Sequence, residues 1–343
     1  MSDGLSYRTA GVDLDRSGAA KGALAALVES TRTPGTLSGL GAFGGLFRVP
    51  REFERPVLVS STDGVGTKLK VAFLVGRHDS VGQDLVNHCV NDILVHGARP
   101  LFFLDYLGMG ELEPGVVEQV VAGVAAACRE NGCALLGGET AEMPGFYEPG
   151  EYDLAGTVVG VVEEELILDG AGIQPGDAVV ALASSGLHSN GYSLARKVVF
   201  ERLGLSPEDP FPDSGETVAE TLLRVHRSYL RALEGPLSDG CLRGLAHVTG
   251  GGLEANLPRV LPPGLSVRVD LRSWDPPPLF RTLQQAGGIE TGEMFRVFNM
   301  GVGMVAFVAT GRTDALVAGL RAAGEEAWVA GEVVEGDGRV MLT

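Results

Sequence analysis

The segment Ser61–Lys70 combines, within a few residues, the residue types that bind phosphate. It reads STDGVGTKLK and follows the apolar run Pro56–Ser60, which predicts a short buried strand. Glycines let backbone N–H groups approach phosphate oxygens, a lysine neutralises their charge, and an aspartate can hold the Mg²⁺ that accompanies a nucleotide. The residues of these types are Asp63, Gly64, Gly66, Thr67 and Lys68. The spacing differs from that of a P-loop, so a plain tight turn is the alternative interpretation of this segment.

Two further carboxylates lie in predicted elements from which they could meet Asp63, and a third follows another predicted strand. One belongs to a helix predicted for residues 79–96, and the other two end or follow predicted buried strands. They are, in chain order, Asp92, Asp105 and Glu139. Carboxylates that converge on a phosphate loop would form a Mg²⁺ site, because that ion prefers oxygen ligands. An isolated aspartate on a helix is otherwise ordinary solvated surface.

Two polar loops in the second half of the chain contain the histidines best suited to proton transfer. His188 lies in the loop of residues 185–191, and His247 precedes three glycines at a predicted helix start, where free N–H groups could hold an anion. An imidazole can move a proton near neutral pH. Alternatively, each ring only hydrogen-bonds to its own loop. His88 and His96 have apolar neighbours in their predicted helix and are interpreted as structural.

The composition limits the classes of function. The chain has 343 residues, of which 45% are hydrophobic, and its formal net charge is −17. This charge would repel nucleic acid and anionic membrane surfaces, so any phosphate must be held locally. No basic-then-apolar leader opens the sequence, and no apolar run has the length of a membrane span. The four cysteines form no C-x-x-C pair, which favours free thiols and a cytoplasmic location.

The order of predicted elements indicates an α/β or α+β protein with two domains. Strands and helices alternate through the first half, and the alternation starts again at Asp177 after a connector. We place the boundary in that connector, which gives domains of residues 1–168 and 169–343. In the second domain, the pattern of residues 214–233 predicts one long helix.

Two segments near the N-terminus have their own patterns. An Ala-rich helix is predicted to follow the caps offered by Asp13 and Asp15. The segment of residues 36–46 then carries four glycines in eleven residues. Such a loop could fold over a ligand, or it could be a plain surface loop.

Taken together, six segments resemble the phosphoribosylformylglycinamidine cyclo-ligases, also called aminoimidazole ribonucleotide synthetases. They occur in the family's order and span nearly the whole chain. Residues 92–100, DILVHGARP, also fit the D-x4-GA-x-P pattern of a wider superfamily that includes selenophosphate synthetase, thiamine-monophosphate kinase and a hydrogenase maturation factor. The six segments are STDGVGTKLK (61–70), CVNDILVHGARPLFFLDY (89–106), GGETAEMPGFY (137–147), SSGLHSNGYSLARK (184–197), HVTGGGLEANLPRVLP (247–262) and MFRVFNMGVGM (294–304).

The resemblance implies an ATP-dependent ring closure in de novo purine biosynthesis. Formylglycinamidine ribonucleotide, a small-molecule substrate, would become aminoimidazole ribonucleotide, with release of ADP and phosphate. The implied fold is the two-domain ATP-binding fold of the superfamily, in which dimerisation completes the N-terminal sheet. ATP and Mg²⁺ are the implied cofactors and a homodimer is the implied assembly.

The resemblance also implies roles for particular residues. The nucleotide would be held by Asp63, Gly64, Gly66, Thr67, Lys68, Asp105, Glu139 and Thr140. The Mg²⁺ ligands would be Asp63, Asp92 and Glu139, and the catalytic candidates are His188, His247 and Lys68. The ribonucleotide would be bound by Ser189, Asn190, Thr249, Gly250 and Gly251. The family often has a basic residue inside its first helix, where this chain has Ala25 and leaves Lys21 as the only nearby lysine.

Two other functions compete with the cyclo-ligase. One is another ATP-dependent phosphotransferase of the superfamily; a selenophosphate synthetase would carry a reactive cysteine in its N-terminal loop, but none precedes Cys89. The other is a non-catalytic nucleotide-binding protein. The intact set of charged residues argues against the second, because a silent protein has no chemical reason to keep it.

Overall fold

Alternating exposure along strand β1 (Pro56–Gly64) gives the first sheet two different faces. In the computed structural model, which describes residues 22, 24–39 and 41–343, four strands form this sheet in the order β1-β4-β2-β3. Strands β1 and β2 are antiparallel to β4, and β3 runs parallel to β2. The other three strands are β2 (Arg99–Met109), β3 (Ala134–Glu142) and β4 (Tyr152–Glu163).

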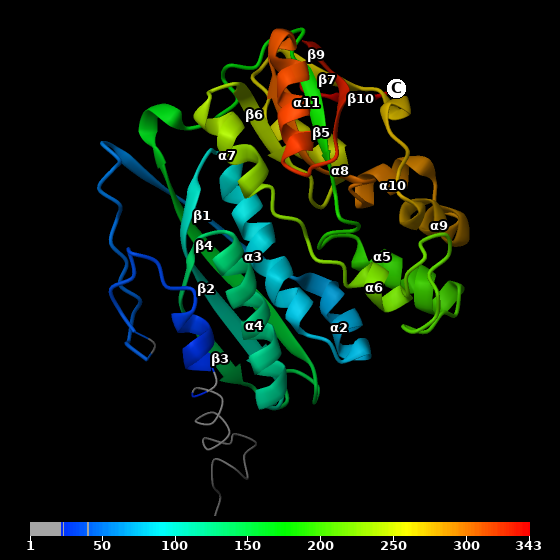
Figure 1. Ribbon diagram of the computed structural model, residues 1–343. Coiled ribbons are helices and arrows are strands. Elements are labelled where there is room, and N and C mark those ends of the chain that lie inside the picture. The colour runs from blue at the N-terminus through cyan, green and yellow to red at the C-terminus, as the bar shows by residue number, and fades with distance from the viewer. Residues whose placement is uncertain (1–21, 23, 40) are drawn as a thin grey trace, which may run out of the picture.

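Helices α3 (Asp79–Leu94) and α4 (Pro114–Glu130) cover one face of this sheet, as Figure 1 shows. Both helices confirm the sequence prediction, and Pro114 occupies the first turn of α4, where its missing N–H is not needed. The two helices pack very closely: a Cβ atom on Gly123 would lie 1.9 Å from the carbonyl oxygen of Asp79. This glycine is therefore required by the helix contact.

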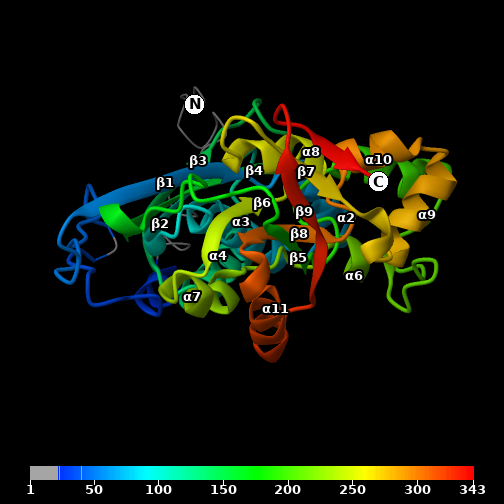
Figure 2. The same ribbon diagram turned by 90° about the horizontal axis from the view of Figure 1, so that it is seen from above.

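The second half of the chain forms a sheet of six strands in the order β10-β7-β9-β5-β8-β6. Seen from above, it lies beside the first sheet (Figure 2). Neighbouring strands are antiparallel except β10 and β7. The strands are β5 (Ala178–Ala183), β6 (Leu242–His247), β7 (Leu265–Val269), β8 (Val302–Val308), β9 (Ala327–Glu335) and β10 (Val340–Leu342). The mixed α/β fold predicted from the sequence is thus confirmed.

The remaining helices are short. The α-helices are α2 (Leu69–Val75), α5 (Tyr192–Arg196), α6 (Val218–Leu222), α7 (Leu230–Ser238), α8 (Gly252–Asn256), α9 (Pro278–Gly287), α10 (Thr291–Val297) and α11 (Thr313–Ala322). The 3₁₀ turns are η1 (Gly66–Lys68), η2 (Glu164–Leu166), η4 (Leu257–Val260), η5 (Leu271–Ser273) and η6 (Thr310–Arg312), and η3 (Lys197–Arg202) is a π-helix.

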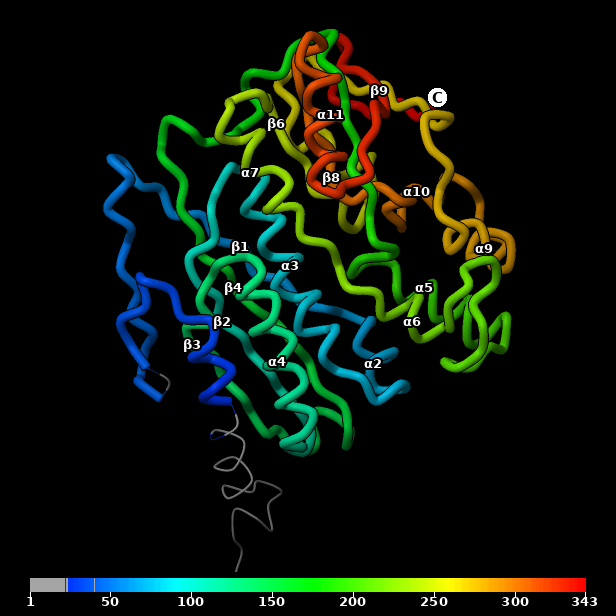
Figure 3. Tube along the Cα trace, in the orientation of Figure 1, coloured from blue at the N-terminus to red at the C-terminus, as the bar shows by residue number. Residues whose placement is uncertain are grey.

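The long helix predicted for residues 214–233 is wrong. Helix α6 ends at Leu222, α7 begins at Leu230, and the chain between them is extended and runs beside α3 (Figure 3). Side chains of α3 satisfy the backbone groups of this segment: Asp84 accepts from the His226 N–H, and Asn91 pairs with Tyr229 N–H and Arg227 C=O. These tertiary hydrogen bonds replace the helical ones, which is why local propensity did not decide the structure.

Three strands of the first sheet are longer than predicted. Asp63 and Gly64 belong to β1, Asp105 lies in the middle of β2, and Glu139 belongs to β3. The carboxylates expected in loops after strands therefore lie within the sheet, and their side chains are distributed over its two faces.

The predicted caps Asp13 and Asp15 lie outside the described residues, as does Lys21. Helix is described over residues 24–29, which include Ala25. Of the helices in the described part of the chain, none combines the length and apolar character that crossing a membrane requires.

Candidate active site

The first carboxylate of the site, Asp63, is paired with a histidine of α3. Its Oδ2 atom lies 2.9 Å from His88 Nε2, and its Oδ1 atom accepts a hydrogen bond from the Gly64 N–H. Side chains of β1 alternate between the two faces of the sheet, and this places Asp63 on the face toward α3. His88 is buried on the side of α3 that faces the sheet. The Asp63 side chain keeps 39% of its surface exposed. It can therefore still reach a ligand from this position.

The second carboxylate, Asp92, connects the two domains. Its Oδ1 atom lies 2.8 Å from Nδ1 of His247, which ends β6 in the second sheet. Its Oδ2 atom accepts a hydrogen bond of 2.9 Å from the Ser61 hydroxyl. The pair forms where α3 meets β6, so it exists only when both domains are in place.

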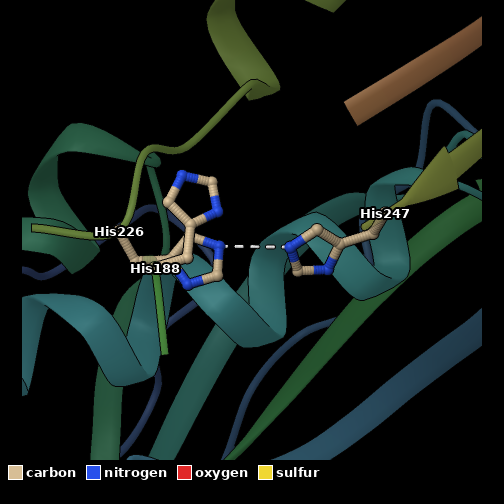
Figure 4. A group of neighbouring side chains, drawn as sticks. All are labelled: His188, His226 and His247. Atoms are coloured by element: carbon tan, nitrogen blue, oxygen red, sulfur yellow. Dashed lines mark hydrogen bonds between the residues drawn. The ribbon is translucent and has the colours of Figure 1, made fainter. Parts of the chain in front are cut away.

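Two more histidines extend this pair into a buried cluster (Figure 4). His226 Nε2 lies 3.1 Å from His247 Nε2, and the rings of His188 and His226 stack with centroids 3.9 Å apart. His188 adopts a left-handed backbone with φ of 60°, and its Nε2 atom accepts a hydrogen bond from the Ser185 N–H. Gly303 makes room for these rings, because a Cβ atom there would lie 1.9 Å from the Tyr229 hydroxyl and 2.6 Å from His188 Cε1.

Burial and pairing set the protonation of the cluster. Burial lowers the pKa values of His188 and His226 well below the usual histidine value. Burial also lowers the pKa of His247, although the bond to Asp92 opposes it. For Asp92 itself, burial raises the pKa, but His247 outweighs that effect and the net pKa is lowered. The pair is therefore best described as an ionised carboxylate beside a neutral imidazole.

The Asp92–His247 pair opens into a cavity of about 330 Å³ between the two domains. Its wall combines residues of β1, the end of α3, β6, α8 and η4, including Ser61, Asn256 and Arg259. Arg259 is the only lysine or arginine among the lining residues. The cavity thus offers a cation, a carboxylate and an imidazole to one small molecule.

Lys68 lies away from this cavity. Its side chain is fully buried, with Nζ 2.7 Å from Asp84 Oδ2, 2.8 Å from the Arg224 carbonyl oxygen and 3.3 Å from the His188 carbonyl oxygen. An ammonium group has three N–H donors, and these three acceptors can use all of them. A contact with phosphate, as predicted from the sequence, would require Lys68 to leave these partners.

The rest of the predicted phosphate loop lies closer to the domain junction. Gly66 has a left-handed backbone with φ of 63° and begins η1, and the Thr67 hydroxyl lies 3.0 Å from that of Ser193. Thr67 is exposed. Gly64, Gly66 and Thr67 therefore remain accessible next to the second domain.

The predicted substrate loops also lie at the cluster. The Ser189 hydroxyl is 3.2 Å from His226 Nδ1, and Asn190 Oδ1 would lie 3.2 Å from a Cβ atom on Gly250. The Thr249 hydroxyl donates to Asn256 at 3.2 Å, and Gly251 precedes α8 with φ of 91°. The structure therefore joins the two loops, which the sequence separates by about sixty residues.

Asp105 and Glu139 do not join Asp63 and Asp92 within one chain. Asp105 shares a cross-strand row with Asp63, but β4 lies between them. Glu139 lies on β3 opposite Tyr106, on the sheet face turned away from α3. Thr140 follows on the same strand.

Sequence reasoning missed two members of the cluster. His88 was interpreted as structural, although its spacing of four residues from Asp92 places both on one helix face. His226 fell within the long predicted helix, and no sequence signal identified it. The spacing on the helix could have identified His88, whereas only the extended path of residues 224–229 explains the position of His226.

The fold and site define a class: two-domain proteins related to AIR synthase. Residues 48–162 match the family described as AIR synthase related protein, N-terminal domain, and residues 174–342 match its C-terminal domain. A thiamine-monophosphate kinase from Stenotrophomonas maltophilia K279a has the same fold, with TM-score 0.71, 20% identity and coverage of 93% of this chain and 95% of that one. A hydrogenase maturation protein HypE in complex with ATP gives TM-score 0.66 at 21% identity, over 99% and 92% of the two chains.

Within this class, the chain belongs to the phosphoribosylformylglycinamidine cyclo-ligase family. It is 54% identical to the cyclo-ligase of Trichlorobacter lovleyi over 328 residues, which are 95% of this chain and 94% of the relative. Identity to the cyclo-ligase of Sorangium cellulosum is also 54%, over 96% and 95% of the two chains. The protein is thus an ATP-dependent ligase that converts formylglycinamidine ribonucleotide to aminoimidazole ribonucleotide in purine biosynthesis. The alternatives of a sibling phosphotransferase and a silent nucleotide-binding protein are not favoured.

Proposed function

We propose that ring closure takes place at the domain junction, with the Asp92–His247 pair as the proton acceptor. The observation that carries this proposal is the 2.8 Å contact between Asp92 Oδ1 and His247 Nδ1 at the wall of the cavity. A carboxylate beside a neutral imidazole is suited to accept a proton, because the imidazolium that forms is stabilised by the adjacent charge.

The proposed reaction has two steps. ATP transfers its terminal phosphoryl group to the formyl amide oxygen while the amide nitrogen releases its proton to solvent, which gives ADP and an iminophosphate. The amidine nitrogen then attacks the activated carbon, loses a proton to the Asp92–His247 pair, and phosphate departs with the C–O electrons. Most of the activation barrier comes from the charge that develops on the phosphoryl group and from the need to orient the reactants. The enzyme lowers it by stabilising that charge and by holding both reactants in place.

The carboxylates Asp63 and Asp92 suit the Mg²⁺ that accompanies ATP. Both side chains are partly exposed, the pKa of each is lowered by its paired histidine in spite of burial, and hard cations prefer such oxygen ligands. Bound Mg²⁺ would neutralise phosphate charge. Glu139 would act as a third ligand only if another chain brought it there, because it lies on the opposite face of the sheet.

The remaining predicted residues receive roles that fit their positions. Gly64, Gly66 and Thr67 would contact the triphosphate, and the loops that hold Ser189, Asn190, Thr249, Gly250 and Gly251 would contact the ribonucleotide. His188, which burial keeps neutral, would support the loop of Ser189. Lys68 is assigned to fixing the phosphate loop against the second domain. Asp105 shares the sheet face of Asp63, whereas Glu139 lies on the other face, so a nucleotide contact of Asp105, Glu139 or Thr140 would have to come from different sides of the sheet.

The test is an assay of ADP release with formylglycinamidine ribonucleotide, ATP and Mg²⁺. We expect Asp63→Asn to lower kcat/KM by about 10²–10³, a typical loss for one electrostatic contact to the transition state. The matched control is Asp153→Asn, an exposed aspartate on β4 of the same sheet. Activity of Asp63→Asn within threefold of the control would refute the assignment of this carboxylate.

A homodimer is supported by the sheet face opposite α3 and α4. That face presents Leu58 at 57% exposure and Tyr106 at 38%, and exposed apolar residues precede β1 at Phe43 and Leu46. Apolar surface of this kind favours burial in an interface. In analytical sedimentation, we expect the native protein to be a dimer and Leu58→Lys to dissociate at a higher protein concentration than the native protein does. A native protein that is monomeric at micromolar concentration would exclude this assembly.

The domain boundary at residues 168 and 169 is proposed because η2 ends at Leu166 and β5 begins at Ala178. A cytoplasmic location is supported by the four free cysteines, Cys89, Cys128, Cys133 and Cys241. No role in nucleic-acid binding is proposed, given the net charge of −17.

A further inference from the structure

Two residues of α3 and one residue of the second domain bring three metal-binding side chains together. His88 and Asp92 are four residues apart and therefore share one face of the helix. His247 approaches them from the end of β6. One ligand atom from each of the three side chains lies within 4.8 Å of the others. The arrangement thus crosses the domain junction and forms only in the assembled fold.

We propose that His88, Asp92 and His247 bind a divalent transition-metal ion of the Zn²⁺ and Co²⁺ type. The donor set contains two imidazole nitrogens and one carboxylate oxygen. Imidazole ligands favour zinc, cobalt and nickel, whereas Mg²⁺ prefers oxygen ligands. The site shares Asp92 with the proposed Mg²⁺ site and differs from it in its two imidazole ligands.

The distances inside the group suit a shared ion. Two ligand atoms bound to one zinc ion lie roughly 3 Å apart, because each metal–ligand bond is about 2 Å long. Asp92 Oδ1 and His247 Nδ1 are 2.8 Å apart. An ion between them would replace the proton of this hydrogen bond and leave His247 Nε2–H free to donate to His226 Nε2, 3.1 Å away.

The surroundings of the group resemble the outer shell of a metal site. His88 Nε2 faces Asp63 Oδ2 at 2.9 Å, and the Ser61 hydroxyl donates to Asp92 Oδ2. Carboxylates behind metal-binding histidines fix the ring orientation and raise its basicity. His88 Nδ1 is buried and has no hydrogen-bond partner among the described residues.

A solvent path to the group exists. Asp92 and His247 line the interdomain cavity of about 330 Å³, which has room for an ion and its remaining water ligands. Asp92 keeps 29% of its side chain exposed. The ion can therefore enter without unfolding of either domain.

A second group of histidines is less suitable. His188, His226 and His247 also bring ring nitrogens within 4.8 Å of one another. However, the rings of His188 and His226 stack at an interplanar angle of 19°, so their in-plane lone pairs run side by side and do not meet at one point. The Nε2 atom of His188 already accepts from Ser185.

An ion at His88, Asp92 and His247 would occupy the pair to which proton transfer was assigned above. A chain that holds this ion cannot use Asp92–His247 as its proton acceptor, so the ion-bound form would be inactive; the proposal concerns binding of the metal alone. Its test therefore contains no nucleotide, no substrate and no measurement of turnover, so it can fail or succeed independently of the proposed function.

The experiment is a titration of the chelator-treated, metal-free protein with Co²⁺, followed by visible absorption. We expect one equivalent to bind per chain, with bands typical of cobalt in a nitrogen and oxygen environment. Addition of Zn²⁺ should bleach the spectrum, and about 10 mM Mg²⁺ should not, because Mg²⁺ disfavours imidazole.

Variants separate the two histidine groups. We expect His88→Gln and Asp92→Asn to weaken Co²⁺ binding at least about 100-fold, and Asp63→Asn to weaken it about 10- to 100-fold through the outer shell. The matched control is His188→Asn, since asparagine tolerates the left-handed backbone at this position, and it should bind within about threefold of the native protein.

Two results would overturn the proposal. One is a folded native protein, verified by circular dichroism, that binds no Co²⁺ at millimolar concentration. The other is loss of binding in His188→Asn with retention in His88→Gln, which would assign the ion to the stacked histidines. If one variant is unfolded, Asp92→Asn and His88→Gln still provide independent tests of the same ligand set.

Discussion

The site contains two carboxylate–imidazole pairs of nearly equal length that differ in their surroundings. Asp63 and His88 lie within the first domain, 2.9 Å apart, and Asp92 and His247 join the two domains at 2.8 Å. Burial lowers the pKa of both histidines, but nearby charges reverse the outcome for His88, whose net pKa is raised. The pKa of His247 stays lowered.

The difference comes from the neighbours of each ring. His88 faces Asp63 and feels the charges of Asp92 and Asp84, which together favour its protonated form. For His247, burial and the nearby charge of His88 lower the pKa and outweigh the hydrogen bond to Asp92. Two pairs with the same geometry can therefore differ in protonation: the imidazole of Asp63–His88 favours the charged form, and that of Asp92–His247 is neutral and able to accept a proton.

The largest expected effect separates the two pairs by function. We expect His247→Asn to lower kcat by about 10²–10⁴, the usual loss when a general base is removed. We expect His88→Asn to act mainly on the KM for ATP, because Asp63 loses its partner. Steady-state kinetics of both variants provide the measurement.

Asp314→Asn on the exposed side of α11 is the control for these kinetics. If His88→Asn lowers kcat as strongly as His247→Asn while KM stays unchanged, the division of roles between the two pairs is wrong.

The second prediction concerns the ion pair that fixes the domain junction. Lys68→Met leaves the fully buried Asp84 without its cation, and we expect the free energy of unfolding to fall by about 3–5 kcal/mol. Urea denaturation measures this change. Because Lys68 also bonds to the carbonyls of His188 and Arg224, the loss should disturb the Asp92–His247 pair more than the Asp63–His88 pair.

The double variant Lys68→Met/Asp84→Asn tests the cause of this loss. It should recover part of the stability, since no charge remains buried without a partner. A double variant less stable than Lys68→Met would show that packing, not the unpaired charge, dominates.

The third prediction addresses protonation directly. In metal-free protein, NMR titration should show His88 protonated at a pH above that at which His247 becomes protonated, because their pKa values are shifted in opposite directions. Asp63→Asn should lower the pKa of His88, to which Asp63 is hydrogen-bonded, more than that of His247, on which Asp63 acts only through its charge. Equal pKa values for the two rings would contradict the comparison.

The smallest expected effect concerns Asp105, a carboxylate that is not paired with a histidine. Burial raises the pKa of Asp105 to about 7, so the folded protein retains a proton there that the unfolded chain has released. Stability should therefore fall as the pH rises from about 4 to about 7, and Asp105→Asn should be stabilising at pH 8 by about 1–2 kcal/mol.

Thermal unfolding of native protein and Asp105→Asn at pH 5 and pH 8 measures this difference. Asp153→Asn, at an exposed aspartate on β4 of the same sheet, is the control variant. A gain that is equal at both pH values would mean that Asp105 is ionised in the fold throughout.

The amino-acid sequence by itself determined the alternation of strands and helices, the family, and the candidates Asp63, Asp92 and His247. Local patterns carry this information: apolar periodicity for α3 and α4, and glycine with charged residues for the phosphate loop. The spacing of four residues also places His88 and Asp92 on one face of the helix.

The tertiary structure alone decided which of these side chains meet. It placed Lys68 in a buried ion pair with Asp84, put Glu139 on the far face of the sheet, and brought His226 into the cluster. The reason is that polar side chains of α3 bind the backbone of residues 224–229 and hold it extended. Such long-range hydrogen bonds outweigh local helix propensity, and a single sequence does not encode them in any short pattern.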